Sequence, residues 1–144
     1  MRKLSFLVAG LGLLLAAGPV AAHHAFESEF DATKHVDFRG TVTKMEWVIP
    51  HAWIHVDVKK PDGTVEAWTV EAGTPSTLLR RGLTKDSLVP GTEIHVDGYQ
   101  SKDGSLRANG RDLTLPNGQH LFLGSSGPGE GAPYEVPRPG VDVK

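Results

Sequence analysis

The stretch HVDFRGTVTKMEWVIPHAWIHVDV, residues 35–58, decides the fold because apolar and polar side chains alternate along it. In residues 35–46 one face carries Val36, Phe38, Gly40 and Val42. In residues 52–58 Ile54, Val56 and Val58 share one face, and Trp53, His55 and Asp57 share the other. A period of two is typical of strands with one face in a core. We therefore predict two β-strands joined across Pro50.

Similar alternation predicts further β-structure downstream. Residues 65–71 follow the turn Pro61-Asp62-Gly63 and are expected to pair with residues 52–58 as a hairpin. Residues 93–99 form a fourth strand, with Ile94 and Val96 inward and with Glu93, His95, Asp97 and Tyr99 outward. Residues 113–115 and 121–123 supply the closing β-structure.

One short helix is expected between the third and fourth strands. Thr74 is a good N-cap, Pro75 suits the first helical position, and Gly82 ends the segment. Five short strands with a helix in this place is the order of an OB-type barrel. We therefore predict an all-β domain with one short helix, a small five-stranded OB-like barrel over residues 35–123. A small β-sandwich is the alternative, because strand count alone does not separate the two.

The N-terminus has the features of a secretory signal. Met1-Arg2-Lys3 is basic, residues 4–17 are apolar and uncharged, and Val20-Ala21-Ala22 offers small residues for cleavage. The apolar run is shorter than the ~20 residues that a spanning helix needs. We predict a signal peptide over residues 1–22, cleavage after Ala22 and a periplasmic or secreted product without stable membrane insertion.

The remaining domain boundaries follow from composition. Residues 23–34 are expected to form an N-terminal extension that precedes the barrel. Residues 124–144 are rich in Gly and Pro and have little to bury, so we predict a disordered tail. The chain thus has one folded domain between two segments that lie outside it.

Composition excludes several function classes. With 15 Lys and Arg against 17 Asp and Glu, the net charge of −2 argues against a nucleic-acid partner. The absence of cysteine excludes disulfide scaffolds, cysteine-ligated zinc, iron–sulfur clusters and thiol catalysis. No nucleophile elbow, phosphate-binding loop or dinucleotide motif is present, so an enzyme is the less favoured class. The seven histidines are the remaining groups that bind soft metals or carry protons.

Cleavage after Ala22 would place His23 at the start of the mature chain, followed by His24. An N-terminal histidine offers its free amine and its ring nitrogen to one metal ion, and a further imidazole completes a three-nitrogen set suited to copper(II). Because the α-amine has a pKa of about 7.7–8.0, copper displaces its proton at neutral pH. The first hypothesis is a copper carrier, chaperone or sensor with His23, His24 and His51 as metal ligands. A copper-dependent redox enzyme is a less favoured version of it.

His51 and His55 have the spacing of a helical zinc motif, but the alternation around them indicates a strand. Four residues of strand span about 13 Å, so these two rings are not expected to share an ion. The second hypothesis is a metal-free OB-like interaction module that binds a small ligand, glycan or protein. Its expected ligand-binding residues, all predicted to face outward, are Trp53, His55, His95 and Tyr99.

Several runs carry a resemblance to a known family. In the first half of the chain they are His23-His24-Ala25-Phe26, Glu29-Phe30-Asp31, Gly40-Thr41-Val42-Thr43-Lys44 and Pro50-His51-Ala52-Trp53-Ile54. In the second half they include Leu78-Leu79-Arg80-Arg81-Gly82, Lys102-Asp103-Gly104-Ser105 and Ala108-Asn109-Gly110-Arg111. With these runs the chain resembles DUF6152, small exported bacterial proteins of unknown function. The resemblance implies export and a single domain but no activity. Ile49 and Leu83 depart from it, since the family pattern usually has Asn and Trp there.

Overall fold

The computed structural model describes residues 26–124 of the 144-residue chain. The predicted signal peptide, its cleavage site, His23, His24 and the predicted C-terminal tail lie outside these residues, apart from Gly124. Within them, no helix has the length and apolar character that crossing a membrane requires.

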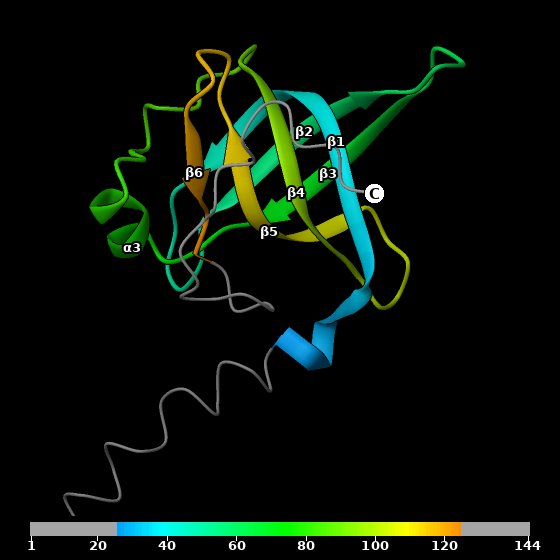
Figure 1. Cartoon of the computed structure of the whole chain (residues 1–144), viewed down its shortest axis with the longest axis horizontal. Coiled ribbons are helices and arrows are strands. Elements are labelled where there is room, and N and C mark those ends of the chain that lie inside the picture. Colours follow the sequence, from blue (N-terminus) through cyan, green and yellow to red (C-terminus); the bar gives the residue numbers. More distant parts are fainter. Residues whose placement is uncertain (1–25, 125–144) are drawn as a thin grey trace, which may run out of the picture.

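The described residues form one sheet that closes on itself (Figure 1). Its elements are β1 (Phe30–Glu46), β2 (Trp53–Lys59), β3 (Val65–Glu71), α3 (Pro75–Arg80), β4 (Glu93–Ser101), β5 (Arg107–Thr114) and β6 (His120–Phe122). The strand order is β3-β2-β1-β4-β5-β6, and β3 also pairs with β5. The first five strands therefore make a ring in which only β3 and β5 run parallel. This confirms the prediction of an all-β, five-stranded OB-like barrel with a helix between the third and fourth strands.

The strand bounds differ from the expected ones. β1 begins at Phe30 and not at His35, and β5 begins at Arg107 and not near Leu113. β6 is a separate sixth strand that pairs only with β5 among the described strands. Residues 26–29, in the predicted extension, form a helical turn. Sequence alternation missed the start of β5 because Asn109, Gly110 and Arg111 interrupt it.

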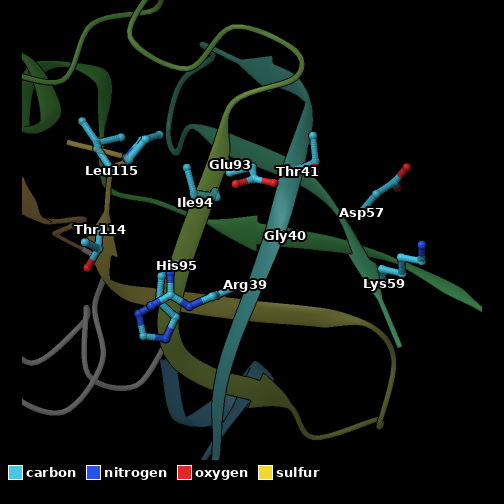
Figure 2. Close-up of a pocket in the computed structure, with 11 residues that line it drawn as sticks. Arg39, Gly40, Thr41, Asp57, Lys59, Glu93, Ile94, His95, Thr114 and Leu115 are labelled. Carbon is cyan, nitrogen blue, oxygen red and sulfur yellow. The ribbon is translucent and has the colours of Figure 1, made fainter. Parts of the chain in front are cut away.

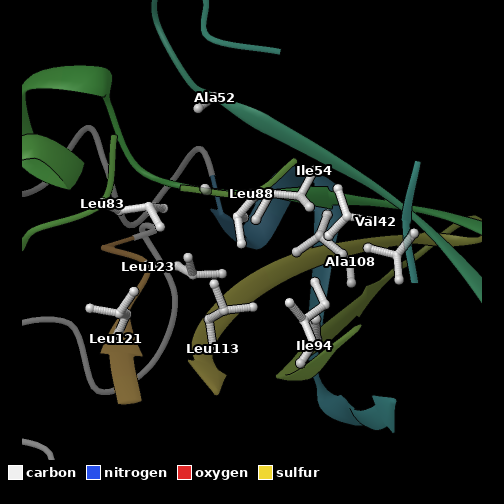
Figure 3. Close-up of a cluster of buried hydrophobic side chains, with 14 of the residues drawn as sticks. Val42, Ala52, Ile54, Leu83, Leu88, Ile94, Ala108, Leu113, Leu121 and Leu123 are labelled. Carbon is white, nitrogen blue, oxygen red and sulfur yellow. The ribbon is translucent and has the colours of Figure 1, made fainter. Parts of the chain in front are cut away.

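The core occupies the interior of the ring (Figure 3). The residues predicted to face inward on β2 and β4 are buried there: Ile54, Val56, Val58, Ile94 and Val96. Figure 3 shows Val42, Ala108 and Leu113 directed at the same interior from β1 and β5. Trp68 on β3 belongs to this cluster as well. The other face of each strand is therefore left for solvent or for a covering segment.

The helix has the ends that the sequence predicts. The Thr74 hydroxyl accepts a hydrogen bond from the backbone N–H of Thr77 at 3.2 Å, and Pro75 is the first helical residue. At the other end Gly82 has φ of +87°, which favours glycine. Gly82 N–H donates to Leu79 O and Leu83 N–H to Leu78 O, each at 3.0 Å, the pattern of a Schellman motif. The motif turns Leu83 back into the core beside Leu78.

Candidate functional site

Five residues stand directly opposite one another on neighbouring strands and form a row across the outside of the barrel. The register pairs Trp53 with Glu71, Glu71 with Asn109, Asn109 with Tyr99, and Tyr99 with His35. Their chain neighbours Ile54, Val70 and Ala108 lie in the core. Because side chains alternate across a strand, these five side chains point away from it. We call this set the outer row.

The segment 26–30 covers part of the outer row. The Phe26 ring packs 5.8 Å from both the Phe30 ring and the Tyr99 ring, and the three form a cluster separate from the main core. Lys102 N–H donates to Glu29 O at 2.9 Å, and the Lys102 ammonium donates to Glu27 O. These contacts hold the chain that follows His23 and His24 against the barrel.

Tyr99 is therefore on the outward face of β4, where it was predicted, but it is covered, and only 8% of it is exposed. The physical reason is the cover by Phe26, a contact that no strand pattern reveals.

His51 contacts Glu71, the one carboxylate in the outer row. Its Nδ1 pairs with Glu71 Oε1. Two backbone hydrogen bonds fix this meeting, from Ala52 N–H to Gly73 O at 3.1 Å and from Ala72 N–H to Ala52 O at 2.9 Å. The Glu71 side chain is 8% exposed and that of His51 is 36% exposed. Burial raises the pKa of Glu71, and the nearby His51 opposes this rise.

Arg107 connects the covering segment to β2. Its Nη2 lies 3.0 Å from Glu29 Oε2. Its guanidinium carbon stands 5.5 Å from the centre of the Trp53 ring and 5.7 Å from that of Phe30, within the range of cation–π contacts. The predicted ligand-binding residue Trp53 is thus half-buried beside a cation.

Asn109 lies between Glu71 and Tyr99 in the outer row and is 1% exposed. Neither its amide nitrogen nor its amide oxygen has a hydrogen-bond partner in the described part of the chain. We call His51, Trp53, Glu71, Arg107 and Asn109 the covered site. In OB-like barrels, ligands bind on strands 2 and 3 between the β1–β2 and β4–β5 loops. His51 lies in the β1–β2 loop, Trp53 begins β2 and Glu71 ends β3, while Arg107 and Asn109 are on β5, just after the β4–β5 loop.

The structure places Tyr99 next to Asn109 of this site, but it does not bring His55 or His95 there. His55 Nε2 lies 3.1 Å from Glu46 Oε1, on the β1–β2 pair. His95 Nε2 lies 2.7 Å from Asp37 Oδ1, on the β1–β4 pair. His55 and His95 therefore contact different carboxylates on different strand pairs, outside the covered site. His51 and His55 also contact different carboxylates.

His95 belongs to what we call the open face, which carries His35, Asp37, His95, Asp97 and Asp112. His35 Nε2 lies 2.6 Å from Asp97 Oδ2. Burial raises the pKa of Asp112, which stands opposite Asp97. The open face borders hollows of about 510 Å³ and about 460 Å³. Figure 2 shows the smaller hollow, with Arg39 and His95 side by side.

Of the predicted metal ligands, the structure describes only His51. Across residues 26–124 no group of three or more His, Asp or Glu residues is arranged to hold a metal ion. Of the two departures from the resemblance, Leu83 packs in the main core and Ile49 is exposed beside Pro50.

Sequence reasoning missed Glu71, Arg107 and Asn109. The sequence contains only a weak signal for two of them: Glu71 ends one β-rich run and Asn109 interrupts another. Only the strand register shows that Glu71 and Asn109 are neighbours.

Comparison with known proteins gives a family and no activity. A search of curated proteins finds no match. The sequence profile described as "Family of unknown function (DUF6152)" matches residues 11–110, which is more than half of the chain and includes every residue of the covered site. The chain belongs to the DUF6152 family.

Proposed function

We propose that this protein is an exported copper-binding protein, a carrier, chaperone or sensor, whose site combines the mature N-terminus with His51. The amine and ring of His23 supply two nitrogens, and His51 supplies the third, with His24 as the alternative third ligand. One observation carries the proposal: His51 Nδ1 is paired with the buried Glu71 carboxylate. Metal-bound histidines commonly donate their second ring N–H to a carboxylate, which fixes the ring and makes it a better ligand. With Nδ1 bound in this way, Nε2 of His51 is the coordinating nitrogen.

The covering segment supports the N-terminal part of this site. Phe26 is 3% exposed and is held against Tyr99 and Phe30, so the chain is anchored three residues after His23. Three residues of extended chain reach about 10 Å. Burial is the main reason that the pKa of Glu71 is raised, and His51 opposes the rise. The negative charge of Glu29, in the same segment, raises the pKa of Glu71 further. The segment therefore passes beside the carboxylate that holds His51.

The competing function is a metal-free interaction module. It is supported by the half-buried Trp53 ring beside the Arg107 guanidinium, in the region where OB-like barrels bind their ligands. In that case a small ligand, a glycan or a protein segment would stack on Trp53. This function needs no free N-terminus, which separates it from the copper proposal.

The deciding experiment is a copper(II) titration of the mature chain that begins at His23, after mass spectrometry has established the first residue of the exported protein. We expect sub-micromolar binding that falls at least tenfold in His51→Ala and in a chain with one extra residue before His23. His95→Ala is the matched control, because His95 also pairs with a carboxylate but stands on the open face. Equal affinity in the mature protein and His51→Ala, or no sub-micromolar binding, would overturn the proposal. Ligand binding that depends on Trp53 and ignores the N-terminus would support the competing function.

A further inference from the structure

Two rows of side chains cross the outside of β2, β1 and β4 at the smaller hollow beside the open face (Figure 2). We call them the acidic row, formed by Asp57, Thr41 and Glu93, and the basic row, formed by Lys59, Arg39 and His95. The rows are two residues apart on each strand, a separation of roughly 7 Å. Both rows point outward, because Val58 and Ile94, which lie between them in the chain, are buried.

Four of these side chains carry a charge that no other described residue neutralises. Arg39 and Lys59 in the basic row, and Asp57 and Glu93 in the acidic row, are exposed. Within residues 26–124 none of the four forms an ion pair or a side-chain hydrogen bond. On the open face next to them, by contrast, Asp37 and Asp97 are each paired with a histidine. The four charges are therefore available to a ligand.

The hollow also supplies neutral surface. Its volume of about 460 Å³ lies within the range of small-molecule sites. The hydroxyl-bearing residues Thr41 and Thr114 line it, and Leu115 and Pro116, which follow β5, give it an apolar part. The hollow thus presents positive and negative groups on separate rows, together with hydroxyls and apolar contact area.

We propose that this hollow binds a small zwitterion, specifically a di- or tripeptide with free termini. A simple anion would be repelled by Asp57 and Glu93, and a simple cation by Arg39 and Lys59, whereas a zwitterion satisfies both rows at once. One residue of extended chain spans about 3.3–3.6 Å, so the ends of such a peptide lie about 7–10 Å apart, which matches the spacing of the rows. The peptide carboxylate contacts the basic row, where the Arg39 guanidinium is suited to a bidentate contact, and the peptide ammonium contacts the acidic row.

The test uses dialanine and two blocked forms of it, N-acetyl-dialanine and dialanine amide. Each blocked form keeps the size of the peptide and loses one of its two charges. Titration of the exported protein followed by ¹H–¹⁵N nuclear magnetic resonance should show saturable shifts for Thr41, His95 and Thr114 with millimolar dialanine at low ionic strength. Because a hydrogen bond to a charged group contributes about 1.5–3 kcal/mol, we expect each blocked form to bind at least about tenfold more weakly.

Two variants assign the ends of the peptide. Arg39→Gln should weaken the binding of dialanine by about tenfold and leave that of dialanine amide unchanged, because the amide has no carboxylate to lose. Glu93→Gln should weaken the binding of dialanine and leave that of N-acetyl-dialanine unchanged, because the acetyl form has no ammonium. Lys34→Gln is the matched control, because Lys34 is an exposed cation of β1 that does not line the hollow, and it should change neither affinity.

These measurements are made with a chelator present, so their outcome is independent of the proposed copper function. Equal affinity for dialanine and both blocked forms would overturn the proposal, as would the absence of saturable shifts or their confinement to residues away from the hollow. An equal loss in Lys34→Gln and Arg39→Gln would reduce the effect to the net charge of the protein and would also overturn it. The substituted side chains are exposed, so unchanged circular dichroism spectra are expected for all three variants.

Discussion

The covered site and the open face contain the same chemistry in different surroundings. Each contains contacts between a histidine and a carboxylate. In the covered site His51 contacts Glu71. On the open face His35 contacts Asp97 and His95 contacts Asp37. The Glu71 side chain is 8% exposed, whereas that of Asp37 is 57% exposed. Water screens the pairs of the open face, so they contribute little to stability. The Glu71 carboxyl of the covered site is shielded from water, so losing His51 leaves it without compensation.

One described segment lies over the side of the barrel that carries the covered site. Residues 26–30 pack on Tyr99 and contact Lys102 and Arg107, and no corresponding segment among the described residues covers the open face. A histidine pair therefore marks a candidate site only where other parts of the chain exclude water from it. The following predictions test this dependence on cover, in order of expected effect.

Phe30→Ala should have the largest effect. Phe30 is 3% exposed and contacts Phe26, so truncation should lower the free energy of unfolding by about 3–5 kcal/mol and loosen the covering segment. Chemical denaturation monitored by circular dichroism measures it. Val65→Ala is the control at an exposed strand position and should change stability by less than about 0.5 kcal/mol. A loss of under about 1 kcal/mol in Phe30→Ala would mean that the segment is not an integral part of the fold.

His51→Ala should destabilise the metal-free protein more than His95→Ala does. Removing His51 takes away the hydrogen-bonding partner of the shielded Glu71 carboxyl, and we expect a loss of about 1–2 kcal/mol. Removing His95 breaks a pair with the exposed Asp37, and we expect about 0–1 kcal/mol. Urea denaturation with a chelator present compares the two variants. Equal losses would show that the cover does not separate the two regions energetically.

Asp103→Ala should have the smallest effect, and that effect should depend on pH. Hydrogen bonds from the Ser101 hydroxyl and the Ser105 N–H lower the pKa of Asp103 from 3.8 to about 2. A lowered pKa stabilises the folded state above the unfolded value, and this stability is lost as the pH falls from about 4 to about 2. Thermal midpoints of Asp103→Ala and the parent protein should therefore differ at pH 6 and converge near pH 2. A difference that does not change with pH would show that Asp103 acts through loop geometry alone. The covering segment, which is hydrogen-bonded to the neighbouring Lys102, would then not depend on the charge of Asp103.

Much of the fold was predictable because it depends on local pattern. The alternation in β2 and β4 predicted which side chains face the core, and Thr74, Pro75 and Gly82 predicted both ends of α3. The start of β5 was not predictable in this way, because Asn109 and Gly110 are poor strand residues. They are accommodated because β5 pairs with both β3 and β4, so tertiary pairing overrides propensity.

The residues of the candidate site likewise include some that the sequence predicted and some that it did not. His51 was identified as a potential ligand from its residue type and its place before a strand. Glu71 and Asn109 were not, because they are 38 residues apart in numbering and meet only through the parallel β3–β5 pairing that closes the ring. Tyr99 was predicted on the correct face, but its cover by Phe26 was not, because that contact comes from a segment outside the strand pattern.

The sequence by itself determined the alternation of strands, the helix ends, the histidine inventory and the resemblance to the family. These depend on residue type and short spacing, which act through local conformational preference. The tertiary structure alone decided which carboxylate holds His51, that Asn109 is left without a described partner and that one of two histidine-bearing surfaces is covered. Ring closure and the docking of residues 26–30 bring together groups far apart in the chain, and burial then changes what those groups can do.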